Sequence, residues 1–486
     1  MLVKNRMGRS KRSYKGKWLD MFYQWDTLQE AREIERPTQT AVQWPRAGQM
    51  TTNGVLSEIR KSTSWKGEQL SDKGRRAEEI LEQLVSNPLL VDFVHLRPKY
   101  KRGRNIVELC DLLIEDEPNA VLLELKVQDR EIAKPERNEQ RWANNQILKA
   151  SRQITGAINA LPKYEIICSN RARGPTLFGK GSLVPLHGVI VVDVSDEPWT
   201  INSALPKHSK HGTPLHYFSH DDFVWLCENL IALPDFFDYL AERSKIPSEA
   251  IPLLNDEKNA YAYYLTHRRK FGAVWKTSDF NEQLHLLLTE HGDKYREKLK
   301  EDEVTGVFKE ILETIHRRHP NPKELIPPYL SRDVAEVTQP VLIARHLNRL
   351  SSLERRYISK KLIEKIRKTD HNPLGFSYFA YKPEESRAKS TAYVFMASKH
   401  ERKERIEDLL TISTCVLDCT ECKLIVGVVT ESAEIGKLVG RSFDYLMMDE
   451  TLRSTDPRDV EDSKQLFEQI EYVRIYDFPT EGDIRD

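Results

Sequence analysis

The segment from Asn105 to Arg130 reads NIVELCDLLIEDEPNAVLLELKVQDR, and it predicts two β-strands joined by a short turn. Ile106 to Ile114 and Ala120 to Val127 are both rich in apolar and β-branched residues. Glu115 to Asn119, between these two runs, has the acidic residues, proline and asparagine that are typical of a turn. The pattern therefore predicts a β-hairpin made of two largely buried strands.

Three charged residues interrupt the apolar pattern of this hairpin. Asp111 lies in the first predicted strand, and Glu124 and Lys126 lie in the second. Because successive side chains of a strand point to opposite faces, Glu124 and Lys126 are expected on one face, with Leu123 and Leu125 on the other. A buried charge is costly unless it is paired or bound to a metal. The hairpin therefore predicts a site that uses these three charges.

Phosphodiester hydrolysis is a chemistry that needs such a group of charges. Two carboxylates can hold a divalent cation, which polarises the phosphate and activates water. An ammonium group beside them can stabilise the charge that develops on the phosphate. Asp111, followed by Glu124-Leu125-Lys126 on the next strand, resembles the motif of the PD-(D/E)XK nuclease superfamily, which includes restriction endonucleases. The proline of that motif is absent, since Cys110 precedes Asp111.

The resemblance implies a metal site with Mg²⁺ or Mn²⁺ as the cofactor. By this resemblance Asp111 and Glu124 are metal ligands, and the backbone carbonyl of Leu125 is a further ligand. Lys126 is expected to orient the attacking water and to stabilise the transition state. The ordinary alternative is an exposed strand face with a salt bridge between Glu124 and Lys126, which would contribute little to stability.

The family core consists of a helix, three strands, a helix and a strand. The spacing of apolar residues predicts helices over 75–85 and 142–161. Further strands are expected over 95–100, 164–168 and 188–194. The last two of these are expected to complete the sheet. The predicted fold class is therefore α/β, with a restriction-endonuclease-like αβββαβ core between about residues 71 and 194.

Polar residues on the two predicted helices complete the expected site. By the resemblance, Glu78 holds a second metal or its water, and Gln146 and Gln153 position water or a phosphate. The alternative for all three is an ordinary polar helix surface. Local basic residues are candidates for binding a nucleic-acid backbone, although those before the hairpin could equally form a solvated tip. The basic candidates are Lys99, Lys101, Arg102, Arg104 and Lys149.

The composition limits the class of protein and its compartment. The chain has 486 residues, so two or three domains are expected. Its formal net charge is zero, so the case for nucleic acid rests on local patches. No apolar run approaches the ~20 residues that span a bilayer, so no membrane association is expected. Six cysteines in a chain of this length indicate reduced thiols and a cytoplasmic location.

The composition and apolar pattern of the sequence change along the chain and predict four parts. These are a basic, partly disordered segment with a short helix (1–60), the nuclease domain (61–243), a helical linker domain (244–344) and a C-terminal α/β domain (345–486). The expected order of helices and strands in the last part is similar to that of the nuclease core. The positions that match Glu124 and Lys126 fall in Phe395–Ser398, which is not acidic. We therefore interpret it as a degenerate copy, used for homo-oligomer formation or DNA contact.

Two further patterns in the second half have alternative interpretations. A basic helix is predicted over Arg345 to Lys368, and it could lie along a duplex or simply expose a charged face. Cys415, Cys419 and Cys422 have the C-x3-C-x2-C spacing that radical S-adenosylmethionine enzymes use for an iron–sulfur cluster. The first two fall on the apolar stripe of a predicted helix, which favours small core residues over a cluster.

Together these features predict a divalent-metal-dependent nuclease that hydrolyses phosphodiester bonds. By the resemblance, DNA is the expected substrate, cleaved internally, in bacterial restriction or phage defence and under the control of a partner protein. The rival hypothesis is a catalytically silent nuclease fold that acts as a nucleic-acid-binding or assembly scaffold. The intact Asp111, Glu124 and Lys126 argue against the rival, since a scaffold needs no buried charges.

Overall fold

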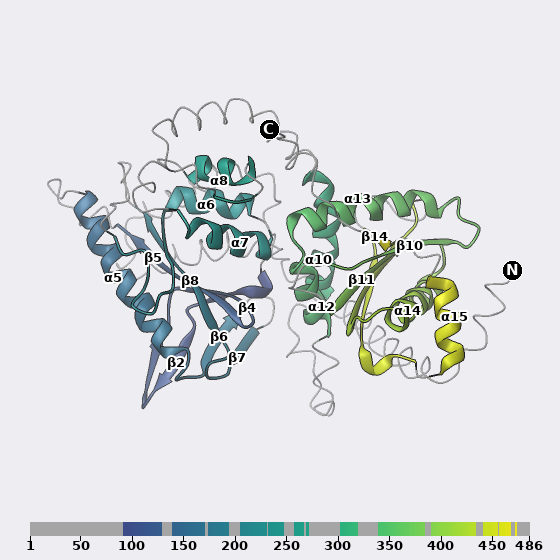
Figure 1. The fold of residues 1–486 in the computed structure, drawn as a ribbon, viewed down its shortest axis with the longest axis horizontal. Coiled ribbons are helices and arrows are strands. Elements are labelled where there is room, and N and C mark those ends of the chain that lie inside the picture. Colours follow the sequence, from purple (N-terminus) through teal and green to yellow (C-terminus); the bar gives the residue numbers. More distant parts are fainter. Residues whose placement is uncertain are drawn as a thin grey trace, which may run out of the picture.

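The computed structural model shows a mixed α/β protein in which three β-sheets are covered by helices (Figure 1). The residues described are 91–128, 139–170, 174–193, 205–230, 232–246, 257–266, 269–271, 302–318, 339–383, 390–433, 441–454, 456–467 and 472–473. The predicted segment 1–60, the predicted helix over 75–85 and Glu78 lie outside these residues.

A five-stranded sheet forms the centre of the N-terminal half, with the order β1-β4-β5-β8-β9. Its strands are β1 (Val94–Leu96), β4 (Leu112–Asp116), β5 (Asn119–Val127), β8 (Val184–Asp193) and β9 (Leu215–Ser219). β4 and β5 form the predicted antiparallel hairpin, and β8 runs parallel to β5. Their nearly continuous apolar runs are typical of strands that are covered on both faces.

Helices cover both faces of this central sheet. One face packs on α5 (Glu139–Ala160), which corresponds to the predicted helix over 142–161. The other face packs on α6 (His220–Asn229), α7 (Leu233–Arg243) and α8 (Glu257–Thr266) (Figure 1). Leu113 and Leu122 lie in the α5 core, whereas Leu112 and Leu123 lie in the opposite core. The side chains of the hairpin therefore alternate between the two cores, as the sequence predicts.

A smaller sheet packs beside α5 and has the order β3-β2-β6-β7. Its strands are β2 (Lys99–Arg102), β3 (Asn105–Glu108), β6 (Ile166–Asn170) and β7 (Gly174–Phe178). The prediction that 164–168 completes the central sheet is therefore wrong, because β6 pairs with β2 and β7. The prediction for 188–194 is confirmed, because β8 pairs with β5.

Two strands predicted as continuous each divide between the two sheets. The strand predicted over 95–100 breaks at Arg97, which has a left-handed backbone (φ 45°) and precedes a proline. The strand predicted over 106–114 breaks at Leu109 to Asp111. There the Leu109 N–H donates to the Pro98 carbonyl, while the Asp111 N–H already donates to Leu123 in the central sheet. The chain therefore changes sheets directly before Asp111.

The C-terminal half contains a second five-stranded sheet, with the order β13-β12-β11-β10-β14. Its strands are β10 (Phe376–Tyr381), β11 (Thr391–Ser398), β12 (Leu424–Glu431), β13 (Phe443–Asp449) and β14 (Tyr472–Val473). One face packs on α10 (Gly306–Arg318), α12 (Gln339–Asn348) and α13 (Ser352–Thr369). The other packs on α14 (Arg402–Cys419), against which α15 (Pro457–Phe467) lies. Short 3-10 helices are η2 (Val91–Phe93), η5 (Glu303–Thr305) and η7 (Glu450–Leu452).

The two halves share a four-element arrangement. In the first, the antiparallel pair β4–β5 is followed by α5 and by β8, which lies parallel to β5. In the second, the antiparallel pair β10–β11 is followed by α14 and by β12, which lies parallel to β11. The outer strands differ, since β9 runs parallel to β8 whereas β13 runs antiparallel to β12. The likeness is therefore limited to the hairpin, the helix and the third strand.

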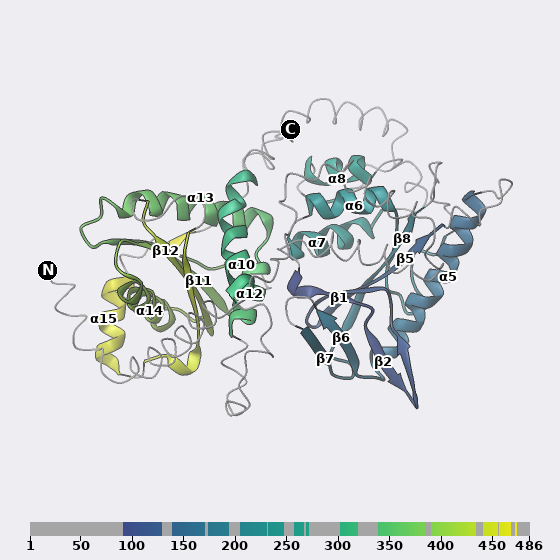
Figure 2. The ribbon, with the colours of Figure 1, turned by 180° about the vertical axis from the view of Figure 1, so that it is seen from behind.

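Charged residues join the two halves along α12, which lies with α10 between the sheets (Figures 1 and 2). Arg345 on α12 donates to both carboxylate oxygens of Glu115 on β4, at 2.6 and 2.9 Å. Its guanidinium also lies over the Phe93 ring, 4.7 Å from the centroid. One turn further along, Arg349 donates to Asp116 at 2.7 Å. The turn end of the β4–β5 hairpin is thus held by the C-terminal half.

A second group of contacts extends this interface. The Asn348 amide and the His316 ring both approach the buried Asp92 carboxylate, at 2.9 and 3.0 Å. The Ser352 N–H donates to Asp235 at 3.0 Å. In these contacts the acidic acceptors come from the N-terminal half and the donors from the C-terminal half, so the charges of the two surfaces are complementary.

The basic helix predicted over Arg345 to Lys368 is wrong in its extent, and its exposed charged face is limited to part of the second helix, with Lys360, Arg367 and Lys368. It is two helices, α12 and α13, and Arg345, Arg355 and Arg356 are buried. Arg355 donates to the carbonyls of Leu350 and Asn348. These arginines are structural, because their partners lie inside the protein rather than on a nucleic acid.

Replacing Arg345 with methionine is expected to lower the free energy of unfolding by about 3–5 kcal/mol, because Glu115 would stay buried without its guanidinium partner. Urea denaturation measures the change. The control Lys368→Met removes an exposed pair with Glu364 and is expected to cost about 0.5 kcal/mol or less. A double variant, Arg345→Met with Glu115→Met, is expected to recover much of the loss, since replacing both buried partners is often nearly neutral. Equal effects of Arg345→Met and Lys368→Met would contradict this account.

Candidate active site

Asp111 and Glu124 face each other at the open end of the β4–β5 hairpin. The register pairs Leu112 with Leu123, and the Asp111 N–H donates to the Leu123 carbonyl at 3.1 Å. This places Asp111 directly opposite Glu124, where side chains of neighbouring strands lie about 5 Å apart at Cβ. Both residues are buried, Glu124 to 2 % exposure. Their side of the sheet is the one that α5 covers, as Leu113 and Leu122 show.

Lys126 lies two residues further along β5 and interacts with both carboxylates. Its Nζ donates to Glu124 Oε2 at 2.7 Å and is 3.9 Å from Asp111 Oδ2. Asp111 Oδ2 also accepts a hydrogen bond from the Leu125 N–H at 2.7 Å. The alternative of an exposed salt bridge is therefore wrong, because Glu124 is buried and its partner lysine reaches a second carboxylate.

Burial changes the acidity of both carboxyl groups, and the Asp111 charge adds to the effect on Glu124. Burial, and then the neighbouring Asp111 charge, raise the pKa of Glu124 from its ordinary value near 4.5 to about 8. Burial also raises the pKa of Asp111, against the opposing effects of Lys126 and the Leu125 N–H. Two adjacent carboxylates that resist ionisation are stabilised in the charged form by added positive charge, which a divalent cation supplies.

The donor set fits a magnesium-type cation in part. Carboxylate oxygens are the ligands that Mg²⁺ prefers, and it is often held by one or two carboxylates together with water. Asp111 and Glu124 supply two such groups. No cluster of three or more His, Cys, Asp or Glu side chains suited to a metal occurs among the residues that the structure describes. Glu78, the third expected ligand, is outside them, and the role of the Leu125 carbonyl stays a prediction.

Glu108 is a third carboxylate near this pair that the sequence interpretation missed. Burial and the Asp111 charge raise the pKa of Glu108, and its own charge contributes to the raised pKa of Glu124. In one continuous strand, residues 108 and 111 would point to opposite faces. The break between β3 and β4 removes that restriction, so the missed signal was the change of sheets, which the apolar pattern does not reveal.

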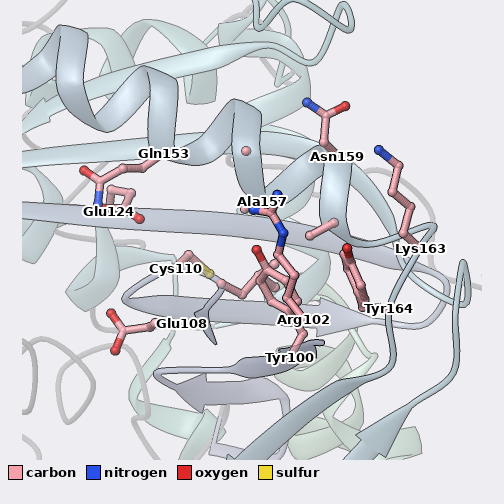
Figure 3. Close-up of a pocket in the computed structure, with 13 residues that line it drawn as sticks. Tyr100, Arg102, Glu108, Cys110, Glu124, Gln153, Ala157, Asn159, Lys163 and Tyr164 are labelled. Atoms are coloured by element: carbon pink, nitrogen blue, oxygen red, sulfur yellow. The ribbon is translucent and has the colours of Figure 1, made fainter. Parts of the chain in front are cut away.

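A cavity of about 410 Å³ opens beside Glu124, between α5 and the β2–β3 hairpin (Figure 3). It brings Glu124 together with two other predicted site residues, Arg102 from β2 and Gln153 from α5. Figure 3 shows Gln153 reaching from its helix toward Glu124. The other polar or aromatic side chains in the wall are Tyr100, Glu108, Asn159, Lys163 and Tyr164.

The remaining predicted residues lie outside this cavity wall. Gln146 is half-buried about two turns before Gln153 on α5, and Lys149 is exposed between them. The rest of the basic group lies exposed on or next to the β2–β3 hairpin, as Lys99, Lys101 and Arg104. These residues form the solvated hairpin that the sequence left as one alternative. A role in binding a nucleic-acid backbone stays a prediction for them.

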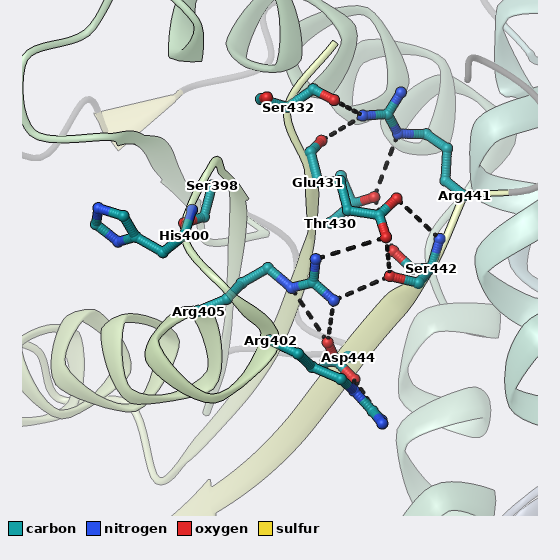
Figure 4. Close-up of polar contacts among 10 residues, drawn as sticks. All are labelled: Ser398, His400, Arg402, Arg405, Thr430, Glu431, Ser432, Arg441, Ser442 and Asp444. Atoms are coloured by element: carbon teal, nitrogen blue, oxygen red, sulfur yellow. Dashed lines mark hydrogen bonds and ion pairs between the residues drawn. The ribbon is translucent and has the colours of Figure 1, made fainter. Parts of the chain in front are cut away.

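The C-terminal half has different residues on the corresponding strand. The side chains of β11 that pack toward α14 come from Val394 and Met396, with Ser398 at the strand end. Nearby charges are paired with one another, as Figure 4 shows: Arg405 and Arg402 both contact the buried Asp444, at 2.6 and 2.8 Å. Among the described residues of this corner, Asp444 and Glu431 share Arg405 as a partner, so these acids take part in internal ion pairs.

The cysteine triplet near this corner lies in and beside α14. Cys415 and Cys422 are buried, and Cys419 is half-buried. Burial raises the pKa of the Cys415 thiol to about 12, so this thiol stays protonated at neutral pH. Cys415 thus behaves as a small core residue, as its place on the helix stripe predicts.

Comparisons with known proteins do not assign a family to this chain. No protein-family model, no curated protein and no solved structure matches it. Within the described residues, no helix has the length and apolar character needed to cross a membrane. The functional interpretation therefore rests on the geometry of the site.

The raised pKa of Glu124 predicts a dependence of stability on pH in metal-free protein. Between about pH 5 and pH 8 the unfolded chain has released the proton of Glu124 while the folded chain retains it, so stability falls as pH rises. One such proton corresponds to a slope of about 1.4 kcal/mol per pH unit. We expect Glu124→Gln to flatten the curve by about this amount in urea denaturation, whereas the exposed control Glu364→Gln should not. An unchanged slope in Glu124→Gln would refute the assignment.

Proposed function

We propose that this protein is a divalent-metal-dependent nuclease that hydrolyses phosphodiester bonds. The observation that carries the proposal is the buried pair Asp111 and Glu124, opposed across the hairpin, with Lys126 in contact with both. A structural salt bridge needs one acid for one base. Ionising a second buried acid that faces the first raises the energy of the folded protein, which favours a ligand whose positive charge offsets this cost.

The surrounding architecture supports a restriction-endonuclease-like core. The hairpin, α5 and β8 occur in the order that the resemblance implies, with β6 and β7 of the smaller sheet inserted between α5 and β8, and the site lies on the face that α5 covers. The helix expected before them lies outside the described residues. The core assignment is therefore part of the proposal.

The roles of the residues follow from their positions. Asp111 and Glu124 would hold Mg²⁺ or Mn²⁺, which supplies Lewis-acid chemistry toward the phosphate and lowers the pKa of bound water. The Leu125 N–H fixes the orientation of the Asp111 carboxylate. Lys126, which contacts both acids in the structure, would stabilise negative charge on the phosphate and orient the attacking water. Gln153 from α5 would contact water or phosphate from the opposite side of the cavity.

The resemblance supplies the biological setting that we propose. It favours DNA over RNA, internal cleavage, and a role in restriction or phage defence under a partner protein. The exposed basic residues around the β2–β3 hairpin are suited to a phosphate backbone, because exposed lysine and arginine side chains displace counterions from it. Contact between copies of the chain through the C-terminal half belongs to the same proposal.

The test is cleavage by purified full-length protein of supercoiled plasmid, linear duplex, single-stranded DNA and RNA. Each substrate is incubated with Mg²⁺, with Mn²⁺ or with EDTA. We expect metal-dependent cleavage by wild type, and a loss of about 10²-fold or more in Asp111→Asn, Glu124→Gln and Lys126→Ala. The control Lys245→Ala removes an exposed lysine that pairs with Glu242, and it should cleave normally.

The outcomes separate the proposal from its rival. Cleavage that persists in Asp111→Asn would place the chemistry elsewhere in the chain. Binding of nucleic acid by wild type without cleavage under any metal would favour the silent scaffold. A Mn²⁺ titration monitored by calorimetry tests the metal site independently, since heat of binding should vanish in Asp111→Asn and persist in Lys245→Ala.

A further inference from the structure

The wall of the cavity beside Glu124 contains amide, cationic and aromatic side chains, which are the groups that bind nucleotides. At one end lie the acidic Glu124 and the amide of Gln153, and at the other lie Lys163, Asn159 and Tyr164 (Figure 3). Its volume of about 410 Å³ is in the range of pockets that enclose one small organic molecule. The cavity can therefore enclose a single nucleotide but not a duplex.

An aromatic pair forms part of the cavity wall. Tyr100 from β2 and Tyr164, which follows α5, are stacked with ring centroids 4.8 Å apart and an interplanar angle of 27°. Tyr100 is buried, whereas Tyr164 is half-buried and therefore presents part of its surface to the cavity. Stacking of a base on an aromatic side chain is the usual way in which proteins bind unpaired bases without strong sequence preference.

Cationic and amide groups surround this pair. Arg102 and Lys163 both line the cavity with exposed side chains, so they can neutralise phosphates at its mouth. The amide of Asn159, at the Tyr164 end, offers a donor and an acceptor, which suits the polar edge of a base. A paired base has its Watson–Crick edge and both faces occupied, so it could stack on Tyr164 only by leaving the helix.

We propose that this cavity holds one unpaired nucleotide next to the scissile phosphate, so that the substrate is a single strand or an unpaired strand end. This inference rests on the proposed nuclease function, because it takes the phosphate to lie at the Asp111–Glu124 end. The base packs against Tyr164, and Arg102 and Lys163 bind the flanking phosphates. The basic residues outside the cavity contact the strand as it leaves.

The experiment measures binding of fluorescein-labelled oligonucleotides to full-length wild type in EDTA, where no cleavage occurs. The ligands are a 20-nucleotide single-stranded DNA, the same sequence as RNA, a blunt duplex, and a duplex with a single-stranded overhang. We expect the single strands and the overhang to bind at least tenfold more tightly than the blunt duplex at the same salt concentration. The DNA and RNA arms show which sugar the site takes.

Variants of the cavity wall test the assignment of the aromatic and cationic groups. Tyr164→Ala should weaken single-strand binding by about 5- to 150-fold, the range for loss of one base stack, and should leave duplex binding unchanged. Tyr164→Phe keeps the ring and should bind like wild type, which separates stacking from a structural role of the residue. Lys163→Gln should reduce single-strand affinity and its salt dependence, whereas the exposed control Lys180→Gln should not.

Several outcomes would overturn the inference. Equal affinity for single strand and blunt duplex would do so, as would equal weakening of both by Tyr164→Ala. Binding of free AMP or dAMP as tightly as the oligonucleotides would assign the cavity to a small ligand instead. Single-strand preference without metal-dependent cleavage would support this site and reject the nuclease. Cleavage of duplex DNA at a rate that Tyr164→Ala leaves unchanged would support the nuclease and reject this site.

Discussion

The cost of ionising two adjacent buried carboxyl groups is the constraint on which this site depends. Asp111 and Glu124 are opposed because the β4–β5 register requires it, and both are shielded from water by the packing of the sheet against α5. Lys126 and the Leu125 N–H compensate part of this cost. The raised pKa of both acids shows that the compensation is incomplete, which is the electrostatic condition that favours a bound cation.

The hairpin that carries this pair is held at both ends. Its open end is fixed by the contact of Asp111 with Leu125, and its turn end by the ion pairs of Glu115 and Asp116 with α12. The C-terminal half is therefore part of the frame that positions the carboxylates. α12 is thus joined to β4 through both carboxylate oxygens of Glu115.

The two halves show how one arrangement of strands and helix can hold different residues. Both contain an antiparallel hairpin followed by a helix and a parallel strand. In the first half the hairpin holds Asp111, Glu124 and Lys126, and Glu124 lines a cavity. In the second half the side chains of β11 that face α14 are apolar. The charged residues near the end of this strand form ion pairs, such as Arg405 with Asp444. The proposed division is thus chemistry in the first half and structural support in the second.

The sequence by itself determined the local features, because they follow from periodicity. The alternation along the hairpin predicted that Glu124 and Lys126 share a face opposite Leu125, and apolar spacing predicted α5 with Gln153 on it. Tertiary structure decided what depends on residues far apart. The pairing of Arg345 with Glu115 spans 230 positions, so no local pattern could show that this arginine is buried rather than free to bind a duplex. The break before Asp111 brings Glu108 near the site because β3 pairs with β2 while β4 pairs with β5, a choice set by competing long-range partners.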